Sequence, residues 1–121
     1  VNDNSPIPFK LCLDVDHGDL SSKNPKDTDP YEWLNEFSKE TSQIHLKQSC
    51  SDKSGHWPFI EEYNSIGKIQ PDKILSSLKN NGNSDIDFIF EFSFRERQPA
   101  DSNVIPHLIE SVNFWRPFIT D

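Results

Sequence analysis

The chain has 121 residues and a formal net charge of -8, from 20 acidic against 12 basic residues. This length allows one domain with a hydrophobic core but not two, and the acidic balance argues against the basic surface that nucleic acids require. No run approaches the ~20 apolar residues of a membrane span, and Cys12 and Cys50 make no disulfide framework, so we expect a soluble, cytoplasmic protein without a membrane partner.

Strand-like and helix-like segments alternate along the chain. The predicted strands cover residues 9–14, 42–48 and 85–94. The predicted helices begin at Pro30, with Asp29 as the N-cap, at Pro71, and at about residue 103. The second helix stops near Gly82, the third ends at about residue 116, and a long loop follows the second strand. Alternation of this kind predicts an α/β fold with parallel strands and right-handed crossovers.

The apolar spacing also predicts which side chains are buried. We expect the helices to cover the sheet with three apolar stripes, formed by Trp33, Leu34 and Phe37, by Ile74, Leu75 and Leu78, and by Val104, Leu108, Ile109, Val112 and Trp115. Cys12 lies in an apolar strand, where we expect a buried, reduced thiol.

Each predicted strand has an apolar face and a second face that ends in a potential metal ligand. Side chains alternate faces along a strand, which places Asp14, His45 and Glu91 at three successive strand ends. Functional groups gather at the carboxyl ends of parallel strands. A mixed carboxylate and imidazole set favours Mn²⁺, Co²⁺, Fe²⁺, Zn²⁺ or Mg²⁺ over calcium. The alternative is a row of polar strand ends that face solvent.

The segment DVDHGDLSS, residues 14–22, contains three closely spaced aspartates, as calcium-binding loops do. An EF-hand loop needs Gly at its sixth position and Glu at its twelfth, but counting from Asp14 these positions hold Asp19 and Pro25. The calcium interpretation therefore fails. We expect His17 to overhang the same strand ends, and Asp16 to be a solvated loop carboxylate.

The segments LCLDVDHGD, IHLKQSCSDKSGHWPF and FIFEFSFRER, in this order, resemble the last three strands of the xylose isomerase-like TIM-barrel superfamily of sugar isomerases and epimerases. The likeness is strongest to tetrulose-phosphate (erythrulose-phosphate) epimerase-type proteins. It implies that residues 1–121 form a single partial domain, the C-terminal three βα units of a (β/α)8 barrel. The absence of methionine, including an initiator, also suggests a fragment or a processed product.

The resemblance implies one divalent metal ion (Mn²⁺, Mg²⁺, Co²⁺ or Zn²⁺) held by Asp14, His45, Glu91 and a glutamate from the preceding strand, which lies outside this chain. It implies proton transfer at the carbon next to a ketose or ketose-phosphate carbonyl, through an enediolate, with Glu91 as one acid/base and the absent glutamate as the other. His17 matches a substrate-binding histidine. A chain that lacks one of two bases is expected to be inactive alone.

Other residues carry weaker expectations. Lys47 and His56 are candidates to bind substrate, Lys47 through a phosphate group or else as a structural ion pair, and Arg95 is a candidate anion contact. Lys53, Ser54 and Trp57 lie on the same loop, Arg97 follows Arg95, and His107 is expected on the surface of the last helix or between helices.

Two further interpretations stay open. One is a non-catalytic α/β fragment or binding module, and the other is an abasic-site endonuclease-like member of the same superfamily, against which the net charge of -8 speaks. Three strands taken from a barrel leave open sheet edges. The chain alone is therefore expected to be marginally stable or to self-associate, and to need the N-terminal half of the barrel as its partner.

Overall fold

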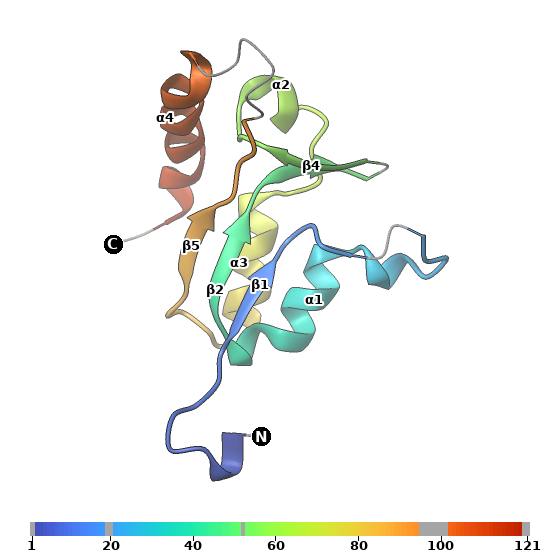
Figure 1. Cartoon of the computed structure of the whole chain (residues 1–121), viewed down its shortest axis with the longest axis vertical. Coiled ribbons are helices and arrows are strands. Elements are labelled where there is room, and N and C mark those ends of the chain that lie inside the picture. The colour runs from blue at the N-terminus through green and yellow to red at the C-terminus, as the bar shows by residue number, and fades with distance from the viewer. Residues whose placement is uncertain (1, 19–20, 52, 95–101, 120–121) are drawn as a thin grey trace.

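A computed structural model describes residues 2–18, 21–51, 53–94 and 102–119, and its centre is a parallel three-stranded sheet (Figure 1). The strands are β1 (Leu11–Asp14), β2 (Thr41–Leu46) and β5 (Asp87–Phe90), in the order β1-β2-β5. Both neighbouring pairs are parallel. This arrangement confirms the predicted α/β class and is consistent with part of a (β/α)8 barrel.

Helices connect and cover the strands as the sequence predicts. The main helices are α1 (Pro30–Phe37), α3 (Pro71–Asn80) and α4 (Val104–Trp115), with a short α2 (Glu61–Asn64). The carboxylate of Asp29 accepts a hydrogen bond from the Tyr31 N–H, which confirms the predicted N-cap of α1. Gly82, with a φ of 72°, follows α3 in the left-handed conformation that glycine adopts most readily. Short 3₁₀ turns, η1, η2, η3 and η5, cover Asn2–Asn4, Pro25–Asp27, Ser38–Glu40 and Arg116–Phe118.

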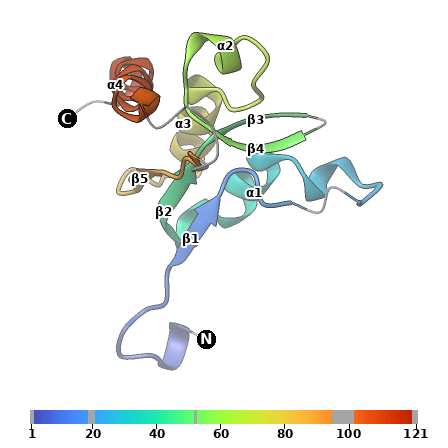
Figure 2. The ribbon, with the colours of Figure 1, turned by 45° about the horizontal axis from the view of Figure 1, so that its top comes forward.

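The long loop predicted after the second strand instead contains a β-hairpin. Strands β3 (Gln48–Cys50) and β4 (Lys53–Trp57) pair antiparallel in a separate two-stranded sheet. Figure 2 shows this hairpin beyond the carboxyl ends of the parallel strands, next to the segment that leads from β1 to α1. The hairpin thus borders the end of the sheet where the candidate ligands lie.

The core lies between the sheet and its helices. Leu13, Ile44 and Leu46 of the strands pack with Leu34 of α1 and with Ile74 and Leu78 of α3. A second part of the core is aromatic: the buried ring of Phe59 stacks on Phe114 and meets Trp115 edge-on, at centroid distances of 5.7 and 5.3 Å. Among the described residues, no helix combines the length and apolar character needed to cross a bilayer.

Several burial predictions are wrong. Ile109 and Val112 of α4 are exposed, because that helix turns Ser111 and Trp115, and not these side chains, toward the core. Trp33 and Phe37 of α1 are also partly exposed. They contact each other, at 6.0 Å between ring centroids, at the margin of the core.

Cys12 is exposed, which corrects the prediction of a buried thiol. Strand alternation puts Cys12 on the face of β1 opposite Leu13, and the helices cover the Leu13 face. The uncovered face carries Ile89 of β5 as well, which is 38% exposed. Consequently the face that would line the interior of a barrel is open in this chain.

Candidate metal and active site

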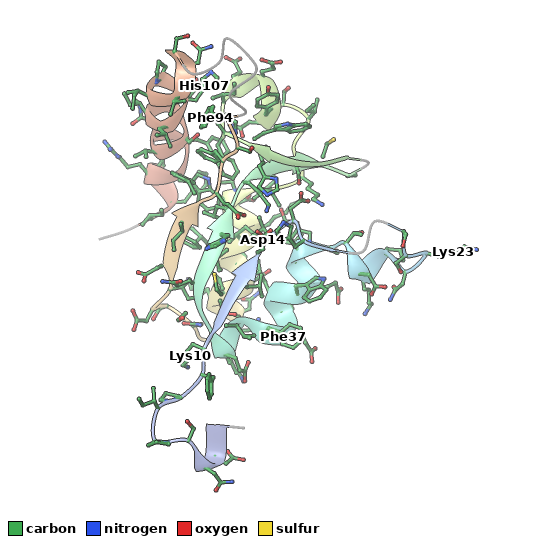
Figure 3. The ribbon with its side chains drawn as sticks, viewed as in Figure 1. Lys10, Asp14, Lys23, Phe37, Phe94 and His107 are labelled. Atoms are coloured by element: carbon green, nitrogen blue, oxygen red, sulfur yellow. The ribbon has the colours of Figure 1, made fainter. Side chains whose placement is uncertain are left out.

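The structure brings the three predicted ligands together at the carboxyl ends of the parallel strands. Asp14 ends β1 and lies opposite His45 of β2 in the strand register. Glu91 directly follows β5, and its N–H donates to the carbonyl of Leu46 at 2.9 Å, which continues the ladder by one residue. One potential ligand atom from each of Asp14, His45 and Glu91 lies within 4.8 Å of the other two. Figure 3 shows Asp14 at the upper end of its strand, remote from the first residues of the chain.

The side chain of Lys47 ends beside two members of this group, Asp14 and Glu91. It is completely buried, and its Nζ lies 2.7 Å from Asp14 Oδ2 and 2.9 Å from Glu91 Oε2. The Nε2 atoms of His17 and His56 lie 3.1 and 3.0 Å from the same nitrogen. Of the two roles expected for Lys47, the structure displays the ion pair.

Asp14 is held in its ionised form. Burial raises the pKa of its carboxyl, but hydrogen bonds from the Lys47 ammonium and from the Asp16 N–H, the latter at 2.8 Å to Oδ1, outweigh burial and place the pKa below its usual value. An ionised carboxylate at the end of β1 is the form that binds a cation.

Asp16 is buried, not solvated as the sequence suggested. Its carboxylate accepts hydrogen bonds from Ser49 Oγ at 2.7 Å and from the Gly55 N–H at 3.2 Å, and it pairs with Lys68 Nζ at 2.7 Å. A buried carboxylate must have such partners to offset its lost hydration. Asp16 therefore ties the loop after β1 to both strands of the β3–β4 hairpin.

The hairpin positions His56 over the strand ends. The carbonyl of His56 accepts a hydrogen bond from the Ser93 N–H at 2.9 Å, which links β4 to the segment after β5. Trp57 stacks on Tyr63 with 4.9 Å between ring centroids, and the Trp57 ring would collide with any Cβ at Gly55. Trp57 therefore packs against Tyr63 and against the backbone at Gly55. His56 is left 36% exposed, with its ring turned toward Lys47.

The remaining expected residues either lie away from the cluster or fall outside the described part of the chain. Arg95 and Arg97 fall outside the described residues, as do the side chains of Lys53 and Ser54. His107 lies in α4, half-buried, with its ring 6.1 Å from that of Phe94, and both are well separated from Asp14 (Figure 3). A cavity of about 700 Å³ lies between α3 and η5, at Leu78, Gly82 and Phe118, away from the ligand cluster.

The donor chemistry of the cluster suits a divalent transition metal ion or Mg²⁺. Within the described part of the chain, two groups of three side chains have ligand atoms close enough to share an ion: Asp14 with His45 and Glu91, and His17 with His56 and Glu91. Mixed imidazole and carboxylate sets of this kind bind Zn²⁺, Mn²⁺ and Fe²⁺. The exposed fractions of His45 and Glu91, 32% and 38%, leave these groups accessible from solvent.

Parallel strands with covering helices and convergent ligands at their carboxyl ends define an α/β protein of the kind found in (β/α)8 barrels. The chain is 46% identical over 116 residues to D-erythrulose 1-phosphate 3-epimerase from Brucella abortus (strain 2308). The match includes 96% of this chain but only 37% of that protein, of which the chain matches the C-terminal part. This similarity confirms the resemblance to erythrulose-phosphate epimerase-type proteins. No family model matches the sequence.

Proposed function

We propose that this chain is the C-terminal part of a divalent-metal-dependent sugar-phosphate epimerase, a partial (β/α)8 barrel domain that inverts the carbon next to a ketose carbonyl. The observation that carries the proposal is the convergence of Asp14, His45 and Glu91, within 4.8 Å of one another, from three adjacent parallel strands. The 46% identity to D-erythrulose 1-phosphate 3-epimerase supports a tetrulose phosphate as substrate and C3 as the reacting carbon.

Asp14, His45 and Glu91 would hold the metal ion, together with a glutamate from a strand that precedes β1. The fit rests on donor chemistry, because one imidazole with carboxylates matches Mn²⁺, Co²⁺, Zn²⁺ or Mg²⁺. When bound, such an ion supplies Lewis-acid stabilisation of negative charge on the substrate oxygens.

Glu91 would move the proton. Its carboxylate lies at the end of the central cluster, 38% exposed, where it can reach a substrate carbon from one side. Inversion requires that a second base return the proton from the opposite side. The resemblance places that base on the glutamate outside this chain, so the 121-residue chain alone is proposed to be inactive.

His17 and His56 would bind the substrate. Both project at the open side of the cluster, with exposed fractions of 60% and 36%, and their rings lie 5.7 Å apart between centroids. Lys47 lies behind them without solvent exposure. It would act on the substrate through these histidines or after a local rearrangement, and Arg95 is retained as a candidate contact for the phosphate.

The direct test follows the reacting proton in the full-length protein. D-erythrulose 1-phosphate is incubated with enzyme in D₂O, and NMR is used to detect deuterium at C3 and the appearance of the epimer. Glu91→Gln is expected to lower both by at least about 10²-fold, since general acid–base groups contribute that much. Glu36→Gln, an exposed carboxylate on α1, is the matched control and should leave the rate unchanged. Activity that survives Glu91→Gln would remove Glu91 from the mechanism, and wild-type protein without exchange would reject the epimerase.

Metal binding is tested separately by Mn²⁺ titration. His45→Ala should weaken binding by at least about tenfold, the loss typical of even indirect support for a metal ligand. His107→Ala removes an imidazole from α4, outside the cluster, and serves as the control. Equal affinities in wild type and His45→Ala would contradict the ligand assignment.

A further inference from the structure

Lys47 places a positive charge where lone pairs from four side chains meet. Its ammonium has three N–H donors and no acceptor, so the Nε2 atoms of His17 and His56, 3.1 and 3.0 Å away, can pair with it only as acceptors, in the tautomers that leave Nε2 unprotonated, and the three N–H groups are shared among four neighbours. The carboxylates of Asp14 and Glu91 complete the shell at 2.7 and 2.9 Å. Imidazole lone pairs and carboxylate oxygens are also the groups that ligate metal ions.

The ammonium contacts all three side chains of one candidate ion group and two of the three side chains of the other. The second group, His17, His56 and Glu91, has ligand atoms within 4.8 Å of one another, and Lys47 Nζ lies within 3.1 Å of an atom in each of these three side chains. His45 belongs only to the first group, and no hydrogen bond or ion pair between Lys47 and His45 is found among the described contacts. The first position therefore retains a ligand that is not committed to the ammonium.

We propose that Lys47 is a built-in cation that fills a second metal position and limits this site to one ion. Removing the ammonium would open a divalent metal site for Mn²⁺ or Zn²⁺, formed by His17, His56 and Glu91. The inference rests on the proposed function, which assigns the single resident ion to Asp14, His45 and Glu91. It concerns the number of ions that the site accepts, which the proposed reaction does not determine.

Charge and spacing both support this role. Two carboxylates, Asp14 and Glu91, face one ammonium in the described cluster, which leaves one negative charge to attract a first divalent ion. A divalent ion held by His17, His56 and Glu91 would have to take the place of the ammonium, which already contacts all three side chains and repels any cation brought into contact with it. Without Lys47, the shared carboxylate of Glu91 lies between the two positions, as bridging carboxylates do in two-metal sites whose ions are about 3.5–4 Å apart.

The test counts bound ions in the full-length protein. Mn²⁺ binding is measured by equilibrium dialysis, and EPR reports whether two bound ions are magnetically coupled. Wild type is expected to bind one ion. Lys47→Met, which keeps the length of the side chain without its charge, should bind two with a coupled signal. Lys47→Arg, which keeps the charge, should bind one. Lys47→Met combined with His56→Ala removes a ligand of the new position and should return to one.

Each alternative result overturns the inference. One ion in Lys47→Met, or two in Lys47→Arg, would show that the ammonium does not control the number of ions. Two ions in the double variant would show that His56 does not form the second position. A wild type that binds no Mn²⁺ rejects the proposed function and this inference together, whereas one ion in both wild type and Lys47→Met rejects only the inference.

His56→Ala in the wild-type background keeps the test decisive if Lys47→Met fails to fold. This variant retains the pairs of Lys47 with Asp14 and Glu91, so the fold is not expected to suffer. It should still bind one ion, because His56 contacts the ammonium and not the resident ion. Loss of that ion in His56→Ala would place the metal at the second position beside Lys47 and overturn the proposal.

Discussion

Replacing Asp16 by Asn tests whether one buried carboxylate holds the hairpin over the site. The Asp16 side chain is completely buried, and its described partners include Ser49 Oγ, the Gly55 N–H and Lys68 Nζ. Asparagine keeps the volume but replaces one acceptor oxygen with a donor NH₂ group and removes the charge. At least one buried group then loses its partner, and Lys68, 15% exposed, loses its counter-ion.

The magnitude follows from these losses. A buried donor left without an acceptor costs about 1–3 kcal/mol, and removing one partner of a buried ion pair costs about 3–5 kcal/mol when both groups are fully buried. Because Lys68 keeps some contact with water, we expect about 3 kcal/mol for local opening of the hairpin. That free energy corresponds to a roughly 150-fold rise in the population of the open hairpin.

The assay is hydrogen exchange measured by mass spectrometry, which reports opening segment by segment. Amides of β3 and β4, between Gln48 and Trp57, should exchange faster by roughly 150-fold in Asp16→Asn. Amides of β2 should not change. Asp85→Asn alters an exposed carboxylate before β5 and is the matched control. A change of less than about threefold in the hairpin would refute the role given to Asp16.

Three further predictions concern charge, packing and the open face. With metal removed by a chelator, the ionised form of Asp14 stabilises the fold at pH values above its usual pKa, and this stabilisation is lost as the pH falls through the lowered folded-state pKa. In Asp14→Asn, the free energy of unfolding, followed by tryptophan fluorescence, should therefore fall less steeply at acid pH. An unchanged dependence on acid pH would contradict the argument. Phe59→Ala should lower the free energy of unfolding in urea by about 3–5 kcal/mol, because its buried ring fills the aromatic part of the core, and a loss under about 1 kcal/mol would count against that packing. Cys12 should react readily with a thiol reagent in the 121-residue chain. In the full-length protein the reaction should be at least about tenfold slower, because a closed barrel would cover the face of β1 that carries Cys12. Equal rates in the two proteins would argue against the barrel.

The sequence predicted the elements whose periodicity is strong. Strands β1 and β2 and helices α1, α3 and α4 lie within a few residues of their predicted bounds, because alternation and N-terminal prolines are local signals. Strand β5 is shorter than predicted: it covers Asp87–Phe90 of the expected residues 85–94. The exposed side of α4 was not predictable in this way. Apolar spacing identifies residues that can be buried, but whether Ile109 and Val112 are covered depends on neighbours that the pattern does not contain.

The site was predictable where strand geometry determined it. Asp14, His45 and Glu91 converge because carboxyl ends of adjacent parallel strands must meet. The burial of Asp16 had no local signal, since its partners Ser49 and Gly55 lie 33 and 39 residues away in the sequence, in a hairpin too short and polar to show strand periodicity. Charge alone suggested a solvated group, and tertiary contacts decided otherwise.

Lys47 and Asp16 are both buried charges at the same end of the sheet, and stability alone gives a weak reason for either. A buried ion pair contributes little compared with packed apolar residues of similar volume, because the charges lose their hydration. The two charges instead fix geometry: Asp16 holds the hairpin that carries His56, and Lys47 aligns the lone pairs of that histidine with those of Asp14 and Glu91. A site that must present several lone pairs toward a small cation gains from such preorganisation, since like-charged carboxylates otherwise repel one another before the ion arrives. Under the proposed function, the cost of burying Lys47 is offset by the ordering of the side chains that would hold the ion.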